Sequence, residues 1–379
     1  MSVFESSVQV FLAPVLQYLK DESVTEIMIN GPKSIFIERR GLIEKTDAKF
    51  EDENSLMAEV RNISQFVGRP IDDQHPFLDA RLPDGSRIHA VVAPIARNGT
   101  TVAIRKFSKD KLQLKDLIAR GALTPDAARF LDVCLYLKKN IIVSGGTGSG
   151  KTTILGILAS RCLPSQRVLV LEDSAELKIH NEHAVFFEAR PADEFGKGQV
   201  TLRDLVKSSL RLRPDRVIVG EVRGAEALDL ISSMNTGHSG SMGTVHSNNP
   251  KECLTRLETL ALMNESEVPV QAVRAQVAAA INIVIQLSRM QDGSRKVTHI
   301  SEGLGMDLQG NYRTNDIYLF EQTGRDKDGK VLGGLNPTGN LPSFMREVEV
   351  NHLPFTREML AKKPSTQPPN GSKSENHAA

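Results

Sequence analysis

One eight-residue segment restricts the possible folds of this chain more than any other feature. Residues 145–152, GGTGSGKT, match the pattern G-x-x-x-x-G-K-[ST], whose backbone N–H groups curl around a phosphate. The apolar run Asn140–Val143 precedes it, and Thr153–Leu158 begins a helical pattern. A glycine-rich turn with a surface lysine would require neither neighbour. The segment therefore predicts a strand, a nucleotide-binding loop and a helix in succession.

The loop predicts that ATP binds together with Mg²⁺, because it contains one residue suited to phosphate oxygens and another suited to the metal ion. Lys151 would reach the β and γ oxygens of ATP, and the hydroxyl of Thr152 would hold Mg²⁺. The residues of this region that we expect to bind nucleotide are Gly145, Gly146, Thr147, Gly148, Ser149, Gly150, Lys151, Thr152 and Thr153.

A second segment, residues 215–223 (DRVIVGEVR), predicts an apolar strand that ends in the acid Glu221. We expect this strand beside the strand of the phosphate loop, so that the carboxylate faces the γ-phosphate. Glu221 would then orient or deprotonate an attacking water. Many such ATPases carry an Asp before this Glu as a metal partner, whereas this chain has Gly220. The alternative is a solvated carboxylate at a strand end.

A third segment, residues 168–177 (VLVLEDSAEL), places Glu172, Asp173 and Glu176 at the end of another strand. Acids at that position face the same crevice as the phosphates. They could bind a metal-bound water or share the role of base with Glu221. The alternative is a solvated turn that caps the next element.

The pattern along the chain predicts two domains and a tail. Residues 1–110 mix helical and strand patterns, which predicts a small α+β domain, and Ser108–Lys111 is the expected linker. Residues 111–360 alternate strands with helices, which predicts an α/β domain with a parallel-rich sheet. Residues 361–379 are polar and Pro-rich, which predicts a disordered tail. In the second domain we expect strands at 140–143, 167–171, 185–189, 216–219, 281–287, 296–301 and 316–320.

Composition weighs against several classes of protein. Lys and Arg number 47 against 46 Asp and Glu, and Trp is absent, so binding of nucleic acid is not expected. Three widely spaced cysteines exclude a disulfide framework and a tetracysteine zinc site. No apolar stretch reaches the length of about 18 residues that suggests a membrane-spanning helix, so we expect no membrane insertion.

Several motifs together resemble one family. The phosphate loop, LEDSAEL, DRVIVGEVR and TGHSGSMGTVHSNNP are similar to the type II/type IV secretion ATPase superfamily. RLPDGSRIHAVVAP and NDIYLFEQTG resemble its CpaF-like branch, the ATPases of Tad/Flp (tight-adherence) pili. The resemblance implies a hexameric ring of RecA-like P-loop motor domains that hydrolyse ATP. It also implies a cytoplasmic protein, peripheral to the inner membrane, that acts on a platform protein there to assemble or retract a pilus or to secrete a substrate.

The same resemblance implies further site residues. His238 and His246 would belong to a histidine box near the γ-phosphate, although a lone histidine is more often structural. Arg81, Arg87 and Arg105 would face the nucleotide from the first domain, and a solvated strand-face cation is the alternative. Arg190, Arg211 and Arg213 also match family positions, and ligand contact and subunit salt bridges both remain open for them. Glu176 is counted with the nucleotide-binding residues.

The chain departs from the family pattern in two respects, and its motifs also allow two rival functions. The longer N-terminal extension of the Tad branch is missing, so its regulatory or docking role is in doubt here. The tetracysteine zinc module of type II relatives is also missing, which favours the pilus branch. One rival is a ring-type nucleic-acid translocase. The other is a nucleotide-gated scaffold that does not hydrolyse ATP, which would not need Glu172 and Glu221.

Overall fold

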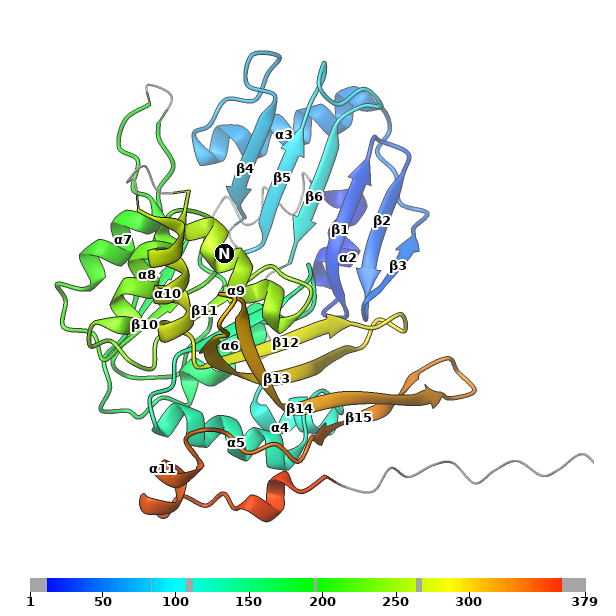
Figure 1. Cartoon of the computed structure of the whole chain (residues 1–379). Helices are drawn as coiled ribbons and strands as arrows, with labels where there is room; N and C mark the ends of the chain where they lie inside the picture. Colours follow the sequence, from blue (N-terminus) through cyan, green and yellow to red (C-terminus); the bar gives the residue numbers. More distant parts are fainter. Residues whose placement is uncertain (1–11, 83, 107–111, 194–195, 264–267, 363–379) are drawn as a thin grey trace, which may run out of the picture. The chain divides into compact units, whose positions relative to one another are not determined.

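The chain forms two compact units, residues 1–111 and 112–379 (Figure 1). The computed structural model describes residues 12–82, 84–106, 112–193, 196–263 and 268–362. The division lies at the end of the expected linker Ser108–Lys111, which is outside the described residues. Most of the expected tail, residues 363–379, also lies outside them.

The first unit is a six-stranded antiparallel sheet with its main helix, α3, packed on one face (Figure 1). The strand order is β3-β2-β1-β6-β5-β4. Leu56, Val60 and Ile63 of α3 join the buried side chains of alternate strand residues such as Ile27 and Ile104 in one core. The elements are η1 (Ala13–Val15), α2 (Leu16–Lys20), β1 (Val24–Asn30), β2 (Ile35–Arg39), β3 (Leu42–Lys45), α3 (Glu53–Val67), β4 (Phe77–Arg81), β5 (Arg87–Val91) and β6 (Thr101–Arg105).

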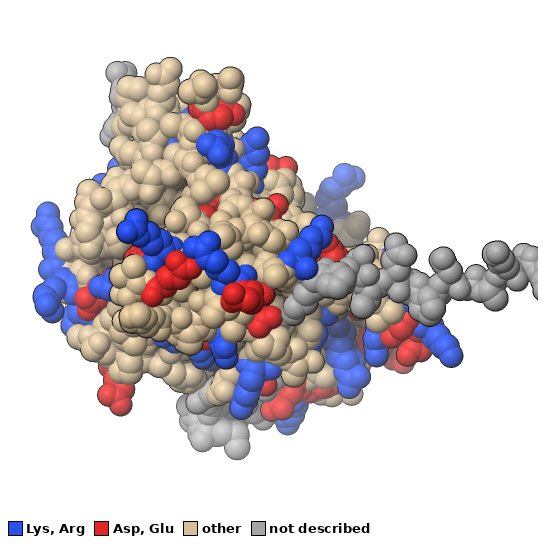
Figure 2. Space-filling model, turned by 60° about the horizontal axis from the view of Figure 1, so that its bottom comes forward, with Lys and Arg blue, Asp and Glu red and all other residues tan. Residues whose placement is uncertain are grey.

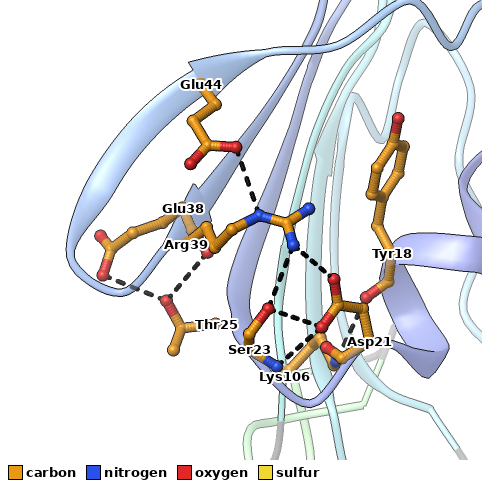
Figure 3. Close-up of polar contacts among 8 residues, drawn as sticks. All are labelled: Tyr18, Asp21, Ser23, Thr25, Glu38, Arg39, Glu44 and Lys106. Carbon is orange, nitrogen blue, oxygen red and sulfur yellow. Dashed lines mark hydrogen bonds and ion pairs between the residues drawn. The ribbon is translucent and has the colours of Figure 1, made fainter.

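Polar contacts fix the end of this sheet from which the chain leaves toward the second unit (Figure 3). Lys106, the last described residue before the linker, donates from Nζ to the carbonyl oxygens of Tyr18 at 3.1 Å and Asp21 at 2.5 Å. The carboxylate of Asp21 lies 2.7 Å from Arg39, which also lies 3.2 Å from Glu44 of the edge strand. The end of β6 is therefore tied to the end of α2.

The second unit is a nine-stranded sheet with helices on both faces (Figure 1). The strand order is β15-β14-β13-β12-β7-β11-β10-β8-β9, parallel from β12 to β9 and antiparallel from β12 to β15. The elements are α4 (Leu114–Ala119), α5 (Pro125–Tyr136), β7 (Ile141–Gly145), α6 (Lys151–Ser160), β8 (Val168–Glu172), β9 (Ala184–Glu188), α7 (Leu202–Ser209), β10 (Arg216–Val219), α8 (Glu226–Asn235), β11 (Met242–Val245), α9 (Pro250–Ala261), α10 (Val270–Ala280), β12 (Ile283–Arg289), β13 (Arg295–Met306), β14 (Tyr312–Arg325), β15 (Val331–Pro337), α11 (Met345–Val350) and η2 (Arg357–Leu360).

Two cores flank this sheet because its central strands are apolar on both faces. Ile141 and Val143 of β7 pack with α5 and α6, whereas Ile142 packs with α8, α9 and α10 on the other face. The α/β architecture with a parallel-rich sheet that the sequence predicts is therefore confirmed.

Two strands were not predicted, and one of them lies between two strands that were expected to be neighbours. Neither β11 nor β15 is among the strands expected from the sequence. Because β11 pairs with β7 on one side and β10 on the other, the strand that leads to Glu221 is not beside the phosphate-loop strand. One strand, β11, separates the two, so the residues that follow β11 lie between the end of β7 and the end of β10.

The surface carries charges of both signs. On the face shown in Figure 2, Lys and Arg side chains are interspersed with Asp and Glu side chains. This mixture agrees with the formal net charge of +1. Among the helices of the described ranges, none combines the length and apolar character needed to cross a membrane.

Candidate active site

The phosphate loop connects β7 to α6 and has the backbone that its glycines predict. Gly148 and Gly150 adopt left-handed φ angles of 67° and 98°, which glycine accepts without strain. A Cβ on Gly145 would lie 2.6 Å from Ser149 Oγ and 2.7 Å from the carbonyl oxygen of Leu287, so no larger residue fits there. The close approach of Ser149 to Gly145 is part of what shapes the turn.

The start of α6 fits a bound phosphate. The N-cap residue of this helix is Gly150, which makes no side-chain cap, and the backbone N–H groups of a helix start favour an anion. Lys151 is 8% exposed, and its Nζ donates to the carbonyl oxygen of Gly146 at 3.0 Å. Thr152 and Thr153 also lie in the first turn, half-buried and exposed.

His246 connects the loop to the acid at the end of β10. Its Nδ1 lies 3.5 Å from Lys151 Nζ and 4.0 Å from Glu221 Oε1, and its Nε2 lies 3.4 Å from Thr147 Oγ1. Glu221 in turn accepts a hydrogen bond of 2.6 Å from Arg223. The structure thus brings Lys151, His246 and Glu221 together from three different elements.

The charges at this point set the protonation of both titratable partners. Burial opposes ionisation of Glu221, but the hydrogen bond and charge of Arg223, together with the charge of Lys151, outweigh it and lower the pKa of Glu221. Partial burial and the charge of Lys151 lower the pKa of His246. At neutral pH the site therefore holds an ionised Glu221 and a neutral His246.

Glu172 lies at the end of β8 and packs on the chain beside Glu221. It is 3% exposed, and its Oε1 accepts hydrogen bonds of 2.9 Å from the backbone N–H groups of Glu176 and Leu177. A Cβ on Gly220 would lie only 2.9 Å from Glu172 Cγ. Burial raises the pKa of Glu172. The glycine that replaces the usual Asp is thus explained by the side chain that fills its place.

The acids that follow Glu172 lie close enough to Arg223 to act on it. Together with the hydrogen bond to Glu221, the charges of Asp173 and Glu176 raise the pKa of Arg223. Arg223 therefore links the acidic segment after β8 to the carboxylate after β10.

The structure does not bring His238 to the phosphate loop. His238 precedes β11 and His246 follows it, so the two lie toward opposite ends of this central strand. The residues after His238 are tied to Asn140, which precedes β7: its Oδ1 accepts from the N–H groups of Gly240 at 2.7 Å and Ser241 at 3.2 Å. Within its own chain, His246 is therefore the histidine that lies at the phosphate loop.

Arg190 also lies away from the loop of its own chain. It follows β9, the edge strand, and four strand spacings of about 4.8 Å separate β9 from β7. Its backbone pairs with Val200, and its Nε donates to the carbonyl oxygen of Gly198 at 2.6 Å. Arg190 therefore does not lie at the phosphate loop of its own chain.

Arg81, Arg87 and Arg105 form a single row across the first unit. Arg81 is the cross-strand partner of Arg87, and Arg87 is that of Arg105. They lie on the sheet face opposite the core of α3, because their neighbours Ile88 and Ile104 point into that core. Like charges placed directly opposite each other destabilise a sheet. Arg87 also lies 3.7 Å from Asp79, so part of the charge of this row is compensated within the unit.

Sequence reasoning missed the residues at the end of β12. Gln286, 1% exposed, donates from Nε2 to the carbonyl oxygens of Ser247 at 3.1 Å and Leu287 at 3.3 Å. Arg295, from the following strand, donates from Nε to the carbonyl oxygen of Gly148 at 2.7 Å. A glutamine within the apolar run 281–287 was the available signal, because a buried amide in a central strand needs specific partners.

Comparisons with known proteins agree with this arrangement. The model of the type II/IV secretion system protein family matches residues 9–325. A Mycobacterium tuberculosis protein named for conjugal transfer is 35% identical over 289 residues, 75% of this chain and 82% of that protein. The type IV secretion system protein VirB11 of Brucella suis is 31% identical over 325 residues, 78% of this chain and 90% of VirB11.

A solved structure supports the fold alone. The Legionella pneumophila ATPase DotB aligns with a TM-score of 0.55 at 21% identity, covering 79% of this chain and 82% of DotB. The family match extends over both compact units, from the first strands to β14. The chain belongs to the type II/IV secretion system protein family.

Proposed function

We propose that this chain is an ATP-hydrolysing motor. The observation that carries the proposal is the convergence of Lys151, His246 and Glu221 at one end of a glycine-rich phosphate loop. Phosphate binding alone would need the loop and the lysine. An ionised carboxylate held near the same lysine is what water activation needs in addition.

In the proposed reaction, water attacks the γ-phosphorus and the bond to the β-phosphate oxygen breaks. Lys151 would exchange its bond to Gly146 for one to the β and γ oxygens. Glu221 would accept a hydrogen bond from the water and orient it, and neutral His246 would contact the γ-phosphate. Bound Mg²⁺, held by the Thr152 hydroxyl and the phosphates, would offset phosphate charge.

Glu172 is the second candidate for proton transfer. Because its pKa is raised, it holds a proton more readily than Glu221 does. Its place against Gly220 puts it next to the residue that precedes Glu221. We propose that Glu221 orients the attacking water and that Glu172 has a supporting role, as an acceptor of the proton that the water loses.

We further propose that the motor is a hexameric ring in which the Arg81, Arg87 and Arg105 row closes over a nucleotide. The repulsion within this row would be relieved by phosphate charge, which grows in the transition state. Arg190 and His238, which lie away from the loop of their own chain, would then be available to a neighbouring chain.

The ring would act at the cytoplasmic face of the inner membrane, on a platform protein, to extend or retract a Tad/Flp-type pilus. The segments RLPDGSRIHAVVAP and NDIYLFEQTG support this branch. The names of the relatives, conjugal transfer and type IV secretion, support the wider role in transport across the membrane.

The decisive experiment is ATP turnover by the purified full-length chain with Mg²⁺. Wild type should release phosphate, and Lys151→Ala should abolish the release while thermal unfolding is unchanged within a few degrees. Lys362→Ala, an exposed lysine near the end of the described chain, is the matched control and should turn over like wild type. Equal turnover by wild type and Lys151→Ala would reject the proposal.

A further inference from the structure

A pocket of about 280 Å³ lies beside the phosphate loop, between the loop and the ends of β11 and β12. The loop contributes Gly146, Thr147 and the inward-turned Ser149, which is 1% exposed. Lys151 and Thr152 do not line it. The pocket is therefore a space next to the phosphate cradle and distinct from the start of α6.

The walls of this pocket suit an anion. Ser288 contributes a hydroxyl and Arg289 a guanidinium, and the described lining residues include no carboxylate. Asn248 contributes an amide that already donates one hydrogen bond, to Glu252 Oε2 at 3.1 Å. The Arg289 side chain lies against the loop, since its Nη1 would be 3.4 Å from a Cβ on Gly148. A phosphate-sized oxyanion would find a cation and neutral donors here.

The amide of Gln286, in the pocket wall, favours a ligand that can donate a hydrogen bond. Both groups near its Nε2 are carbonyl oxygens, of Ser247 and Leu287, so the amide orientation is fixed. Its Oε1 has no hydrogen-bond partner in the described part of the chain. A buried acceptor of this kind favours a ligand or water that can donate.

One anion produced at this site also carries a donor. The γ-phosphate of fully ionised ATP has no P–OH group, whereas inorganic phosphate released at neutral pH keeps at least one. The pocket adjoins Thr147, which contacts His246 at the end of the loop where Lys151 and Glu221 meet. A cleaved phosphate would therefore emerge next to it.

We propose that this pocket is a transit site for inorganic phosphate, which leaves between the loop and β12 before ADP is released. The proposal rests on the ATP hydrolysis proposed above. It predicts that cleavage and phosphate release can be separated by changes in the pocket that leave the loop, Lys151 and Glu221 intact.

The test uses two variants of the full-length chain and a single turnover of ATP. Acid quench measures cleavage, and a fluorescent phosphate sensor measures release. Ser288→Leu should leave the cleavage rate within twofold of wild type and slow phosphate release at least tenfold, because the larger side chain obstructs the pocket. Ser165→Leu, at an exposed turn, is the matched control and should change neither rate.

The second variant tests binding. Arg289→Met should raise the inhibition constant of inorganic phosphate about tenfold while the KM for ATP stays within twofold, and Arg97→Met should change neither. Parallel rises of both constants would place Arg289 on ATP itself and overturn the proposal. Unchanged release in Ser288→Leu would also overturn it. If wild type cleaves no ATP, the proposed function is rejected instead. Calorimetric titration of inorganic phosphate into wild type and Arg289→Met then tests the pocket alone. Tighter binding to wild type supports a phosphate site, and equal binding or no binding rejects it.

Discussion

Glu172 fills the space that a side chain at position 220 would need. A Cβ on Gly220 would lie 2.9 Å from Glu172 Cγ and 3.5 Å from Glu172 Cβ, and Glu172 is 3% exposed. Real Cβ atoms do not approach so closely, so a larger residue at 220 requires the glutamate to move. The two positions at the ends of β8 and β10 are thus not independent.

Gly220→Ala should therefore cost both stability and activity. We expect a loss of about 1–3 kcal/mol in the free energy of unfolding, as for other overpacked cores, and a lower kcat because Glu172 is displaced. Gly324→Ala in β14, where a Cβ would meet nothing within 4 Å, is the matched control. Denaturant unfolding and steady-state turnover measure the two effects. Wild-type values for Gly220→Ala would show that the site accommodates the methyl group.

Glu221→Gln should separate ATP binding from hydrolysis. The amide keeps the size of the side chain but loses the charge that orients water, so kcat should fall by about 10² or more while the KM for ATP changes little. Glu182→Gln, an exposed residue before β9, is the control for removal of one carboxylate. If turnover by Glu221→Gln remains at the wild-type rate, the role of base belongs to Glu172.

The pH dependence of stability should reveal the buried state of Glu172. Its pKa is raised in the folded chain, so between the ordinary carboxyl pKa and the folded value the native state binds more protons than the unfolded state. The contribution of Glu172 to stability is therefore present at low pH and is lost as pH rises through the folded pKa.

The variant Glu172→Gln isolates this effect because glutamine stays neutral and its Oε1 can still accept from the N–H groups of Glu176 and Leu177. Relative to wild type, the variant should become more stable as pH rises from about 4.5 toward neutrality. Denaturant midpoints measured across this range test the sign. A constant difference between the two proteins would mean that Glu172 titrates like an exposed carboxylate.

The phosphate loop could be predicted from the sequence because its function depends on contiguous residues. Its glycines, its lysine and both flanking elements lie within about 20 positions, and local pattern is enough to place them. The position of Glu221 relative to the loop could not be predicted in the same way. It depends on β11, whose four residues, MGTV, include a glycine and form no distinctive strand pattern.

The difference between the two histidines has the same cause. Only the knowledge that a strand runs between His238 and His246 places one toward each end of that strand. Likewise, the pairing of Arg81, Arg87 and Arg105 follows from strand register, which depends on turns and on the burial of the other sheet face. Sequence spacing alone carries no such information.

In this register Arg87 is the central arginine of the row. It has an arginine directly opposite on both sides, so its removal should relieve repulsion in the free protein. Its ion pair with Asp79, at 3.7 Å and partly exposed, contributes little in return. We therefore expect Arg87→Gln to unfold at the same temperature as wild type or higher, and yet to hydrolyse ATP at least tenfold more slowly.

The combination of outcomes is what identifies a role in the reaction. A residue that only supports the sheet would lose stability and activity together, whereas a phosphate-facing arginine loses activity alone. Arg97→Gln, an exposed arginine outside the strands of this sheet, should change neither quantity. Thermal unfolding and turnover are measured on the same preparations. If Arg87→Gln turns over like wild type, the row faces no nucleotide, and closure of the first unit must depend on other side chains.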